Sequence, residues 1–260
     1  MLDRETMFRA PAATYDRFVG RYSPRLAAAL CDAAGIKPGQ RVLDVGCGSG
    51  ALVAELAQRL GAENVTGIDP SEPFVEAAQD RVPGARLVVG SAESLPFADG
   101  EFDATLSQLV VNFLTQPEQG LGEMVRVTRA GGVVAGCVWD YRGEMTMLRA
   151  FWDAAISLDP DAADEGAVMR FATPEELRDL WAGAGLGGVE VTTLVVDASY
   201  EGFDDLWEPF LAGIGPAGAY TASLEPDGQA ALRDEFARRL GTPDGAFTLS
   251  ARAWCAVGLV

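Results

Sequence analysis

The sequence predicts an α/β fold with a doubly wound, mostly parallel sheet and a helical lid near its C-terminal end. Three observations predict it. Short β-branched runs alternate with amphipathic helical stretches between residues 41 and 140. The connections between them are short, which is typical of a parallel sheet covered on both faces. A glycine-rich turn, VLDVGCGSG (42–50), joins the first strand to a helix.

Capping residues and hydrophobic periodicity justify each element. The first helix, over 23–34, has Ser23 as its N-cap, Pro24 at its first position and Gly35 after its end. Strands are expected at 41–46, 64–69, 85–90, 102–110, 131–140, 188–197 and 246–260. Further helices are expected at 49–60, 71–82, 117–129 and 173–185. The last of these begins at Thr173, with Glu176 completing a capping box.

These elements predict a Rossmann-like core over 41–200 and 246–260. Residues 1–40 are expected to form an N-terminal helical cap, and 201–245 a helical insertion, or lid, between the last two of seven strands. The insertion is expected to hold two helices. Residues 141–172 are expected to be helical and irregular, with the acidic stretch LDPDAADEG as an exposed loop.

Composition limits the cellular setting. Hydrophobic residues make up 48% of the chain, enough for a sizeable core, yet no run is long and apolar enough to span a membrane. Charges near the N-terminus argue against a secretory signal, so a cytoplasmic protein is expected. The cysteines are scattered and give no metal spacing, so reduced thiols and no metal site are expected.

The charge balance excludes several kinds of partner. The net charge is −18, from 38 acidic and 20 basic residues, and Lys37 is the one lysine. Such a surface disfavours nucleic acid and anionic membranes as partners. Histidine is absent, which excludes Ser-His-Asp catalysis and histidine-bound metals.

The glycine turn allows a ligand to approach the backbone. Gly46, Gly48 and Gly50 permit a sharp turn, and the helix that follows offers free N–H groups and a partial positive charge. A plain strand-to-helix turn explains the pattern equally well when it is taken alone. GCGSGA also fits the dinucleotide fingerprint, so a nicotinamide-dependent oxidoreductase is an alternative.

Three acidic or polar features favour another ligand. Asp44 lies inside the first strand, where it can organise the turn or attract an ammonium group; the alternative is a carboxylate that binds loop N–H groups. Asp69 ends the second strand 23 residues after Gly46, where a carboxylate can bind ribose hydroxyls. The alternative for Asp69 is helix capping, with Pro70 at the first helical position. The segment 91–93 can bind an adenine edge or be an ordinary polar loop.

Four motifs together resemble a known family. VLDVGCGSG, GIDPSEPFVEAAQ, GSAESLPFADGEFDATLSQLVVNFL and EMVRVTRAGGVVAGCVWD are similar, in order and spacing, to class I S-adenosylmethionine-dependent methyltransferases. The small-molecule group related to ubiquinone and menaquinone biosynthesis enzymes is the most similar. The resemblance covers 41–140, and more loosely 15–27. It implies S-adenosylmethionine as cofactor and methyl transfer to a small, apolar or aromatic acceptor by in-line displacement.

The resemblance also implies a set of cofactor-binding residues. Gly46, Cys47 and Gly48 are expected to pack against the methionine and ribose portion. Asp44 is expected beneath the methionine amino group, and Asp69 is expected to bind the ribose hydroxyls.

The remaining implied positions lie farther along the chain. Pro70 and Ser71 are expected near the adenine, and Ala92 and Glu93 at its edge. The methionine end is expected to be closed by Ser107 and Gln108. The family often has histidine near positions 112 and 113, where this chain has Asn112 and Phe113.

No catalytic residue is predicted. Tyr15, Tyr22 and carboxylates of the lid are available as bases, and none is assigned. Arg21 can reach the cofactor's carboxylate, although a surface arginine is the more common explanation.

The apolar face of the stretch 203–214 favours core packing, with an acceptor-binding role as the alternative. In that alternative, Trp207 and Phe210 are expected to line the acceptor site together with Phe113 and Trp139. For the whole chain, the alternative functions are a non-catalytic domain that binds S-adenosylmethionine or S-adenosylhomocysteine, and the nicotinamide-dependent oxidoreductase.

Overall fold

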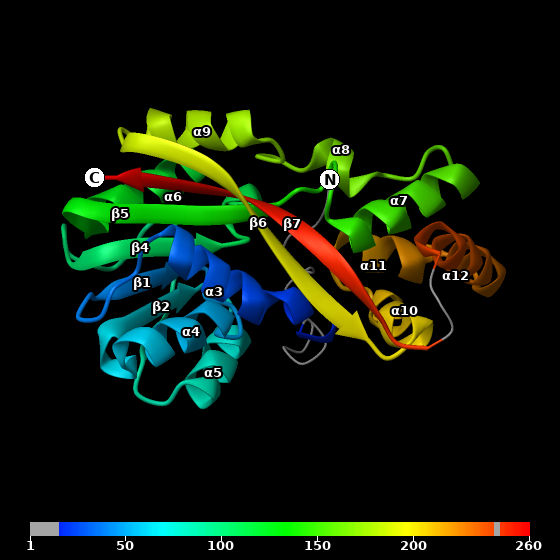
Figure 1. Ribbon diagram of the computed structural model, residues 1–260, viewed down its shortest axis with the longest axis horizontal. Coiled ribbons are helices and arrows are strands. Elements are labelled where there is room, and N and C mark those ends of the chain that lie inside the picture. The colour runs from blue at the N-terminus through cyan, green and yellow to red at the C-terminus, as the bar shows by residue number, and fades with distance from the viewer. Residues whose placement is uncertain (1–15, 242–244) are drawn as a thin grey trace. The chain divides into compact units, whose positions relative to one another are not determined.

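The computed structural model describes residues 16–241 and 245–260 (Figure 1). The strands are, in chain order, β1 (Val42–Val45), β2 (Val65–Asp69), β3 (Arg86–Val89), β4 (Phe102–Gln108), β5 (Thr128–Trp139), β6 (Gly187–Tyr200) and β7 (Phe247–Leu259). The α-helices are α3 (Ser23–Ala33), α4 (Ala51–Leu60), α5 (Glu72–Arg81), α6 (Pro117–Val127), α7 (Thr146–Leu158), α8 (Glu165–Val168), α9 (Pro174–Gly183), α10 (Phe203–Leu211), α11 (Gly215–Ser223) and α12 (Pro226–Leu240). Short 3-10 helices are η1 (Val19–Tyr22), η2 (Ala62–Asn64) and η3 (Val111–Phe113). Among these residues, no helix is both long and apolar enough to cross a bilayer.

The strands form a seven-stranded sheet in the order β3-β2-β1-β4-β5-β7-β6. Neighbouring strands from β3 to β5 are parallel, and β7 is antiparallel to β5. The chain moves outward from β1 to β3 and then returns to β4 on the other side of β1. The predicted fold class, a mostly parallel α/β sheet, is confirmed.

The order of the strands determines which helices cover which face. Right-handed crossovers place α4 and α5 on one face, because both lead toward β3, and place α6 on the other, because it leads from β4 to β5. In agreement, α3 packs on α4, and α9 packs on α6. The sheet is therefore doubly wound, as predicted.

One boundary and one capping contact differ from the expected ones for local reasons. β5 begins at Thr128, whereas a helix was expected to continue through Arg129. The Thr128 hydroxyl donates to the carbonyl of Met124 (2.7 Å) and bonds the Thr105 hydroxyl (2.6 Å), so this residue ends the helix and starts the strand. At α9, Thr173 caps the helix as expected, and the carboxylate of Glu176 accepts from the Ala172 N–H, one residue before the cap.

The described chain divides into two compact units. One contains residues as far as Tyr22 together with 140–169 and 195–252, and the other contains 23–139, 170–194 and 253–260. The predicted boundaries at 40, 200 and 246 do not coincide with the limits of these two units. The predicted division into a cap, a core and a lid therefore stays a prediction.

An aromatic cluster forms the core of the unit that contains α7 and α10. The Phe210 ring is fully buried and stacks on Phe151, with ring centroids 4.6 Å apart. It also contacts Phe18 at 4.8 Å, Phe236 at 5.5 Å and Trp207 at 5.9 Å. Core packing therefore explains the apolar face of α10. Three helices, α10 to α12, occupy the stretch where two were expected.

The acidic stretch 158–166 is not simply an exposed loop, because Glu165 in it is buried. Its side chain is 4% exposed and accepts a hydrogen bond from the Trp152 indole N–H at 3.2 Å. Burial raises the pKa of Glu165 from 4.5 to about 7; the charge of Asp164 acts in the same direction and the indole bond opposes it. The carboxyl group therefore holds its proton to a higher pH in the folded chain than in the unfolded chain.

We expect the free energy of unfolding of the Glu165→Gln variant to depend less on pH than that of the wild type. Because the folded pKa is raised, the folded chain retains a proton that the unfolded chain loses between pH 4.5 and about 7. Wild-type stability should therefore fall over this range by up to about 3 kcal/mol, and the variant should lack that loss. Urea unfolding at several pH values measures it. Glu175→Gln, at an exposed position of α9, is the control; equal slopes in Glu165→Gln and wild type would contradict the expectation.

Candidate functional site

The glycine turn after β1 is held by backbone hydrogen bonds to β2. The N–H groups of Gly46 and Cys47 both donate to the carbonyl of Ile68, at 2.8 and 3.0 Å. Gly46 and Gly48 have φ of +77° and +50°, values that favour glycine. A Cβ on Gly46 would lie 2.3 Å from Val110 Cγ2, whereas a Cβ on Gly48 would meet nothing within 4 Å. One glycine is required by packing and the other leaves the backbone open to a ligand.

Asp69, at the end of β2, ties the glycine turn to the start of α5. Its Oδ2 accepts from the Gly48 N–H and its Oδ1 from the Ser71 N–H, both at 2.9 Å. α5 begins at Glu72 with Ser71 at the N-cap and no side-chain capping bond, so the helix-capping alternative, with Pro70 at the first helical position, does not hold. Burial raises the pKa of Asp69, and the two N–H donors lower it. Each carboxylate oxygen retains a second acceptor position.

Asp44 is buried without a hydrogen-bond partner. Its side chain is 1% exposed, and within the described residues neither oxygen makes a hydrogen bond. The alternative in which it binds loop N–H groups is therefore wrong. Burial, and then the charge of Asp69, raise the pKa of Asp44 well above its ordinary value. The Val53 N–H of α4 lowers this pKa, although it is not placed to make a hydrogen bond with Asp44.

Strand register brings Asp44, Asp69 and Gln108 to one face of the sheet. Asp44 pairs with Leu106 on β4 and with Gly67 on β2. Because side chains alternate along a strand, Gln108 and Asp69, each two residues farther on, share the face of Asp44. Ser107 points to the opposite face. Three acceptor groups therefore lie on one face of three adjacent strands, near their carboxyl ends.

Gln108 and Ser107 both hold buried atoms without partners in the described part of the chain. The Gln108 Nε2 donates to the Ser23 carbonyl at 3.3 Å, and its Oε1 has no partner. The Ser107 hydroxyl is fully buried and makes no hydrogen bond. Buried polar atoms without partners are uncommon, and they indicate a ligand or an ordered water.

Glu93 is engaged with α6. Its Oε1 accepts from the Gln116 N–H and its carbonyl from Gln119 Nε2, both at 2.7 Å. The Glu93 N–H donates to the Ser91 hydroxyl, and Ala92 is buried beside it. A role at an adenine edge stays a prediction for Ala92 and for the other carboxylate oxygen of Glu93.

Two residues of the site were not identified from the sequence. Leu109 has φ of +63°, a strained value for a branched side chain. It follows β4 directly and precedes Val110, whose side chain packs against Gly46. Neither residue type indicates this role, so no local signal in the sequence would have found them.

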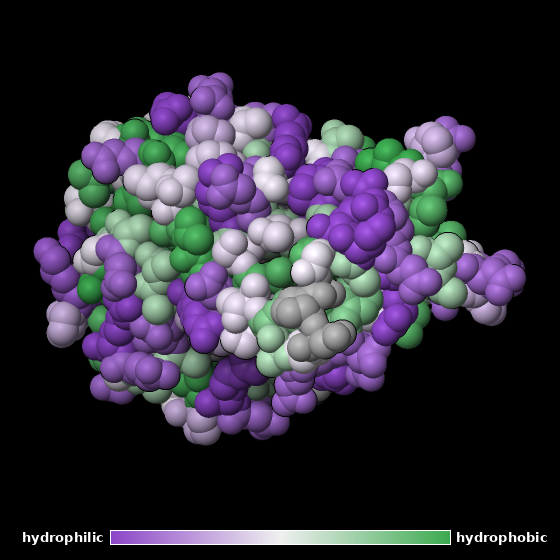
Figure 2. Space-filling model, turned by 45° about the vertical axis from the view of Figure 1, so that its right-hand side comes forward, coloured by the Kyte–Doolittle hydropathy of each residue, from purple (hydrophilic) through white to green (hydrophobic). Residues whose placement is uncertain are grey.

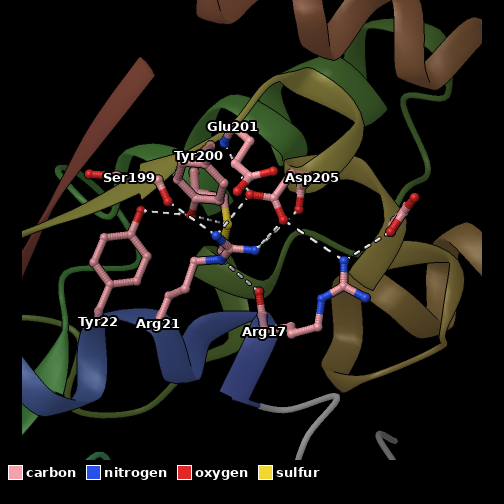
Figure 3. Close-up of polar contacts among 9 residues, drawn as sticks. Arg17, Arg21, Tyr22, Ser199, Tyr200, Glu201 and Asp205 are labelled. Carbon is pink, nitrogen blue, oxygen red and sulfur yellow. Dashed lines mark hydrogen bonds and ion pairs between the residues drawn. The ribbon is translucent and has the colours of Figure 1, made fainter. Parts of the chain in front are cut away.

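The structure alters the interpretation of two residues of the N-terminal segment. Arg21 is neither a surface arginine nor free for a ligand, because it is 20% exposed and pairs with Asp205 at 2.5 Å (Figure 3). The Tyr22 hydroxyl is buried and bonds that of Tyr200 at 3.2 Å. Burial raises the pKa of both phenols, that of Tyr200 to about 12, so Tyr22 is not a base near neutral pH. Tyr15 lies outside the described residues.

Comparison with known proteins identifies the family. A family model for a methyltransferase domain matches residues 43–136. The chain is 34% identical, over 200 residues, to the malonyl-[acyl-carrier protein] O-methyltransferase of Geobacter sulfurreducens. That match covers 74% of this chain and 73% of the relative. The chain belongs to the class I S-adenosylmethionine-dependent methyltransferases. Its cofactor is therefore S-adenosylmethionine, as the resemblance implied.

A second named methyltransferase matches a smaller part of the chain. The demethylmenaquinone methyltransferase of Beutenbergia cavernae is 41% identical over 104 residues, which is 40% of this chain and 42% of the relative. The chain therefore aligns with less than half of that enzyme's length.

Solved structures support the methyltransferase fold. Geranyl diphosphate C-methyltransferase from Streptomyces coelicolor A3(2) aligns with a TM-score of 0.52 and 16% identity, covering 91% of this chain and 79% of that one. The [4+2]-cyclase SpnF aligns with a TM-score of 0.57 and 21% identity, covering 91% of this chain and 81% of that one. At these identities the likeness concerns the fold alone, which carries more than one activity.

Proposed function

We propose that this methyltransferase binds S-adenosylmethionine at the carboxyl ends of β1, β2 and β4 and transfers its methyl group to a small, uncharged, apolar or aromatic acceptor. One observation carries the proposed cofactor site: Asp44 and Gln108 offer buried acceptor atoms without partners on the face that also holds Asp69. This position is the point where the strand order reverses, at which open α/β sheets bind ligands.

The residues present fit the methionine end of the cofactor. A primary ammonium group donates hydrogen bonds and carries the positive charge that a buried carboxylate needs. Asp44 and Gln108 Oε1 supply acceptors for it. Gly46, Cys47 and Gly48 would pack along the chain of the ligand, where Gly48 leaves the space that a Cβ would fill. The main-chain carbonyl of Ser107 would contribute from the end of β4, since its side chain lies on the opposite face.

The adenosine end would be held by β2 and the loop after β3. Asp69 retains one acceptor position on each oxygen, which suits the two vicinal hydroxyls of a ribose. Pro70 and Ser71 would lie near the base, and Ala92 and Glu93 at its edge. The carboxylate of Asp69 is already oriented by the N–H groups of Gly48 and Ser71, so little entropy is lost when it binds.

The bound cofactor supplies a sulfonium methyl group that is already activated for displacement. The protein then has to hold donor and acceptor in line, an effect that can reach about 7–11 kcal/mol. Tyr22 is excluded as a base, and the chain has no histidine. Orientation and exclusion of water are therefore the proposed means of catalysis, and no catalytic residue is assigned.

The charge distribution supports an uncharged acceptor and disfavours nucleic acid. The net charge is −18, and carboxylates already neutralise many arginines of the described residues. These paired arginines are Arg17, Arg21, Arg59, Arg86, Arg126, Arg129, Arg149, Arg233, Arg238, Arg239 and Arg252. Hydrophilic residues are spread over the face in Figure 2. An anionic acceptor would meet repulsion, and within the described residues most arginines are already paired with carboxylates.

The relatives act on acceptors of two kinds, which gives a direct test. One acts on demethylmenaquinone, and the other on a malonyl group carried by a protein. We expect methyl transfer to neutral hydroxylated aromatic compounds, with kcat/KM at least about tenfold above that for the same compounds bearing a carboxylate, because burying an unpaired charge is costly. Detection of S-adenosylhomocysteine release measures it.

Controls separate the proposed function from its alternatives. Malonyl-[acyl-carrier protein] and single-stranded RNA are assayed in parallel, and preferred methylation of either would contradict an uncharged small acceptor. Binding of S-adenosylhomocysteine without turnover on any acceptor would favour the non-catalytic alternative.

A further inference from the structure

The β3–β4 loop (90–101) is bound to one face of α6. Four residues of this helix and its N-cap make hydrogen bonds to the loop: Gln116, Gln119, Glu123 and Arg126. Residues that follow one another at steps of three and four lie on a single face of a helix. The loop is therefore attached to a polar stripe that runs along α6.

Arg126 uses all five of its N–H donors in this attachment. Its Nε donates to Glu123 Oε1 at 2.7 Å, and its Nη2 to Glu123 Oε2 at 2.8 Å and to the Leu95 carbonyl at 2.9 Å. Its Nη1 donates to the Phe97 carbonyl and to the carboxylate of Asp99, both at 2.8 Å. The bond from Arg126 lowers the pKa of Glu123, so this pair stays ionised near neutral pH. A planar guanidinium with every donor occupied fixes the direction of the groups that it binds.

The stretch that carries Ala92 and Glu93 is short and is held at both ends. Before it, the Gly90 N–H donates to the carbonyl of Asp69 at the end of β2, at 3.0 Å. After it, the N–H and the carbonyl of Leu95 are both bound to α6. Because few residues lie between the two attachments, the position of Leu95 limits where Ala92 and Glu93 can lie.

Arg126 makes the more protected of the contacts between the loop and α6. The bonds that Glu93 receives from Gln116 and Gln119 are exposed, so water competes for them. The bond from Arg126 to the Leu95 carbonyl is partly buried, and the Leu95 side chain is only 4% exposed. A hydrogen bond shielded from water is electrostatically stronger than an exposed one. The position of the loop therefore depends more on Arg126 than on the two glutamines.

We propose that Arg126 is a positioning residue for recognition of the adenine edge, acting through Leu95 on Ala92 and Glu93. The inference rests on the proposed function, in which Ala92 and Glu93 lie at the edge of the base. Arg126 does not touch the cofactor in this role. It holds the β3–β4 loop in place, so that the polar groups of the loop lie at a fixed distance from the 6-amino group of adenine.

Calorimetry with two ligands tests the proposal. One is S-adenosylhomocysteine, and the other is its analogue with hydrogen in place of the 6-amino group. The wild type should prefer the first by about ten- to hundredfold, the effect of one hydrogen bond to a charged acceptor. Arg126→Ala should raise the Kd of S-adenosylhomocysteine by about three- to thirtyfold and that of the analogue by less than about twofold. Arg126→Lys, which keeps the charge without the planar fork, should lower the preference as well, and it serves if Arg126→Ala does not fold.

Arg59→Ala is the matched control in α4. Arg59 likewise binds a carboxylate of its own helix, Glu55, a second carboxylate, Asp32, and the main-chain carbonyl of Ala28. Its side chain is 26% exposed, against 32% for Arg126. All three partners lie outside the β3–β4 loop. The control should therefore lose a similar amount of stability in urea unfolding and keep the wild-type preference between the two ligands.

The preference between the ligands separates positioning from a general structural role. An unchanged preference in Arg126→Ala would overturn the inference, whether the two Kd values stay the same or rise equally. An equal fall in preference in Arg59→Ala would also overturn it. A wild type that binds both ligands equally would overturn the inference together with the adenine-edge assignment of Ala92 and Glu93. Failure of the wild type to bind S-adenosylhomocysteine would instead overturn the proposed function itself.

Discussion

Replacing Asp69 with alanine is expected to weaken S-adenosylhomocysteine binding by at least about a hundredfold, since the two hydrogen bonds proposed to this charged group each contribute about 1.5–3 kcal/mol. The substitution removes the carboxylate proposed to accept from the ribose hydroxyls. It also leaves the N–H groups of Gly48 and Ser71 without their acceptor, so the glycine turn loses its link to α5. Calorimetric titration measures the affinity, and thermal unfolding shows how much of the loss comes from the fold.

Two variants separate the charge from general effects. Asp69→Asn keeps one acceptor but turns an NH₂ toward Gly48 or Ser71, so it should fall between alanine and the wild type. Asp99→Ala removes a carboxylate whose side chain is 82% exposed, and it should bind like the wild type. Wild-type affinity in Asp69→Ala would show that the ligand does not lie at the end of β2.

Gly46→Ala is expected to destabilise the fold by at least about 3 kcal/mol, the combined effect of overpacking and a left-handed backbone. The added Cβ would lie 2.3 Å from Val110 Cγ2, and φ at this position is +77°. The backbone cannot easily shift away from Val110, because the Gly46 N–H donates a hydrogen bond to the Ile68 carbonyl. Urea unfolding measures the free energy, and Val110→Ala in the same chain should restore part of it.

Gly48→Ala is the matched comparison at the same turn. Its φ is +50° and no atom lies within 4 Å of the added Cβ, so the fold should lose only about 1 kcal/mol. Cofactor affinity should nevertheless fall, because the methyl group would enter the space proposed for the ligand. Equal destabilisation of the fold by the two alanines, or unchanged affinity in Gly48→Ala, would contradict this account of the turn.

The sequence by itself determined the elements and predicted a place for the cofactor site. Strand periodicity and helix caps are local signals, so β1 to β7 and α3 to α6 were predicted with errors of a few residues at their ends. The glycine turn and Asp69 are also local features: each follows a strand directly, and parallel strands bring their carboxyl ends to one edge. The resemblance to methyltransferases rested on these same segments, and the comparisons confirmed it.

Only the tertiary structure decided what each polar side chain touches. Gln108 meets Ser23 across 85 residues, and Arg21 meets Asp205 across 184. Asp44 has no hydrogen-bond partner in the described chain. Glu165, expected in an exposed loop, is instead buried and accepts a hydrogen bond from the Trp152 indole N–H. Burial and pairing depend on which distant segments pack together, and a pattern within ten or twenty residues carries no record of that.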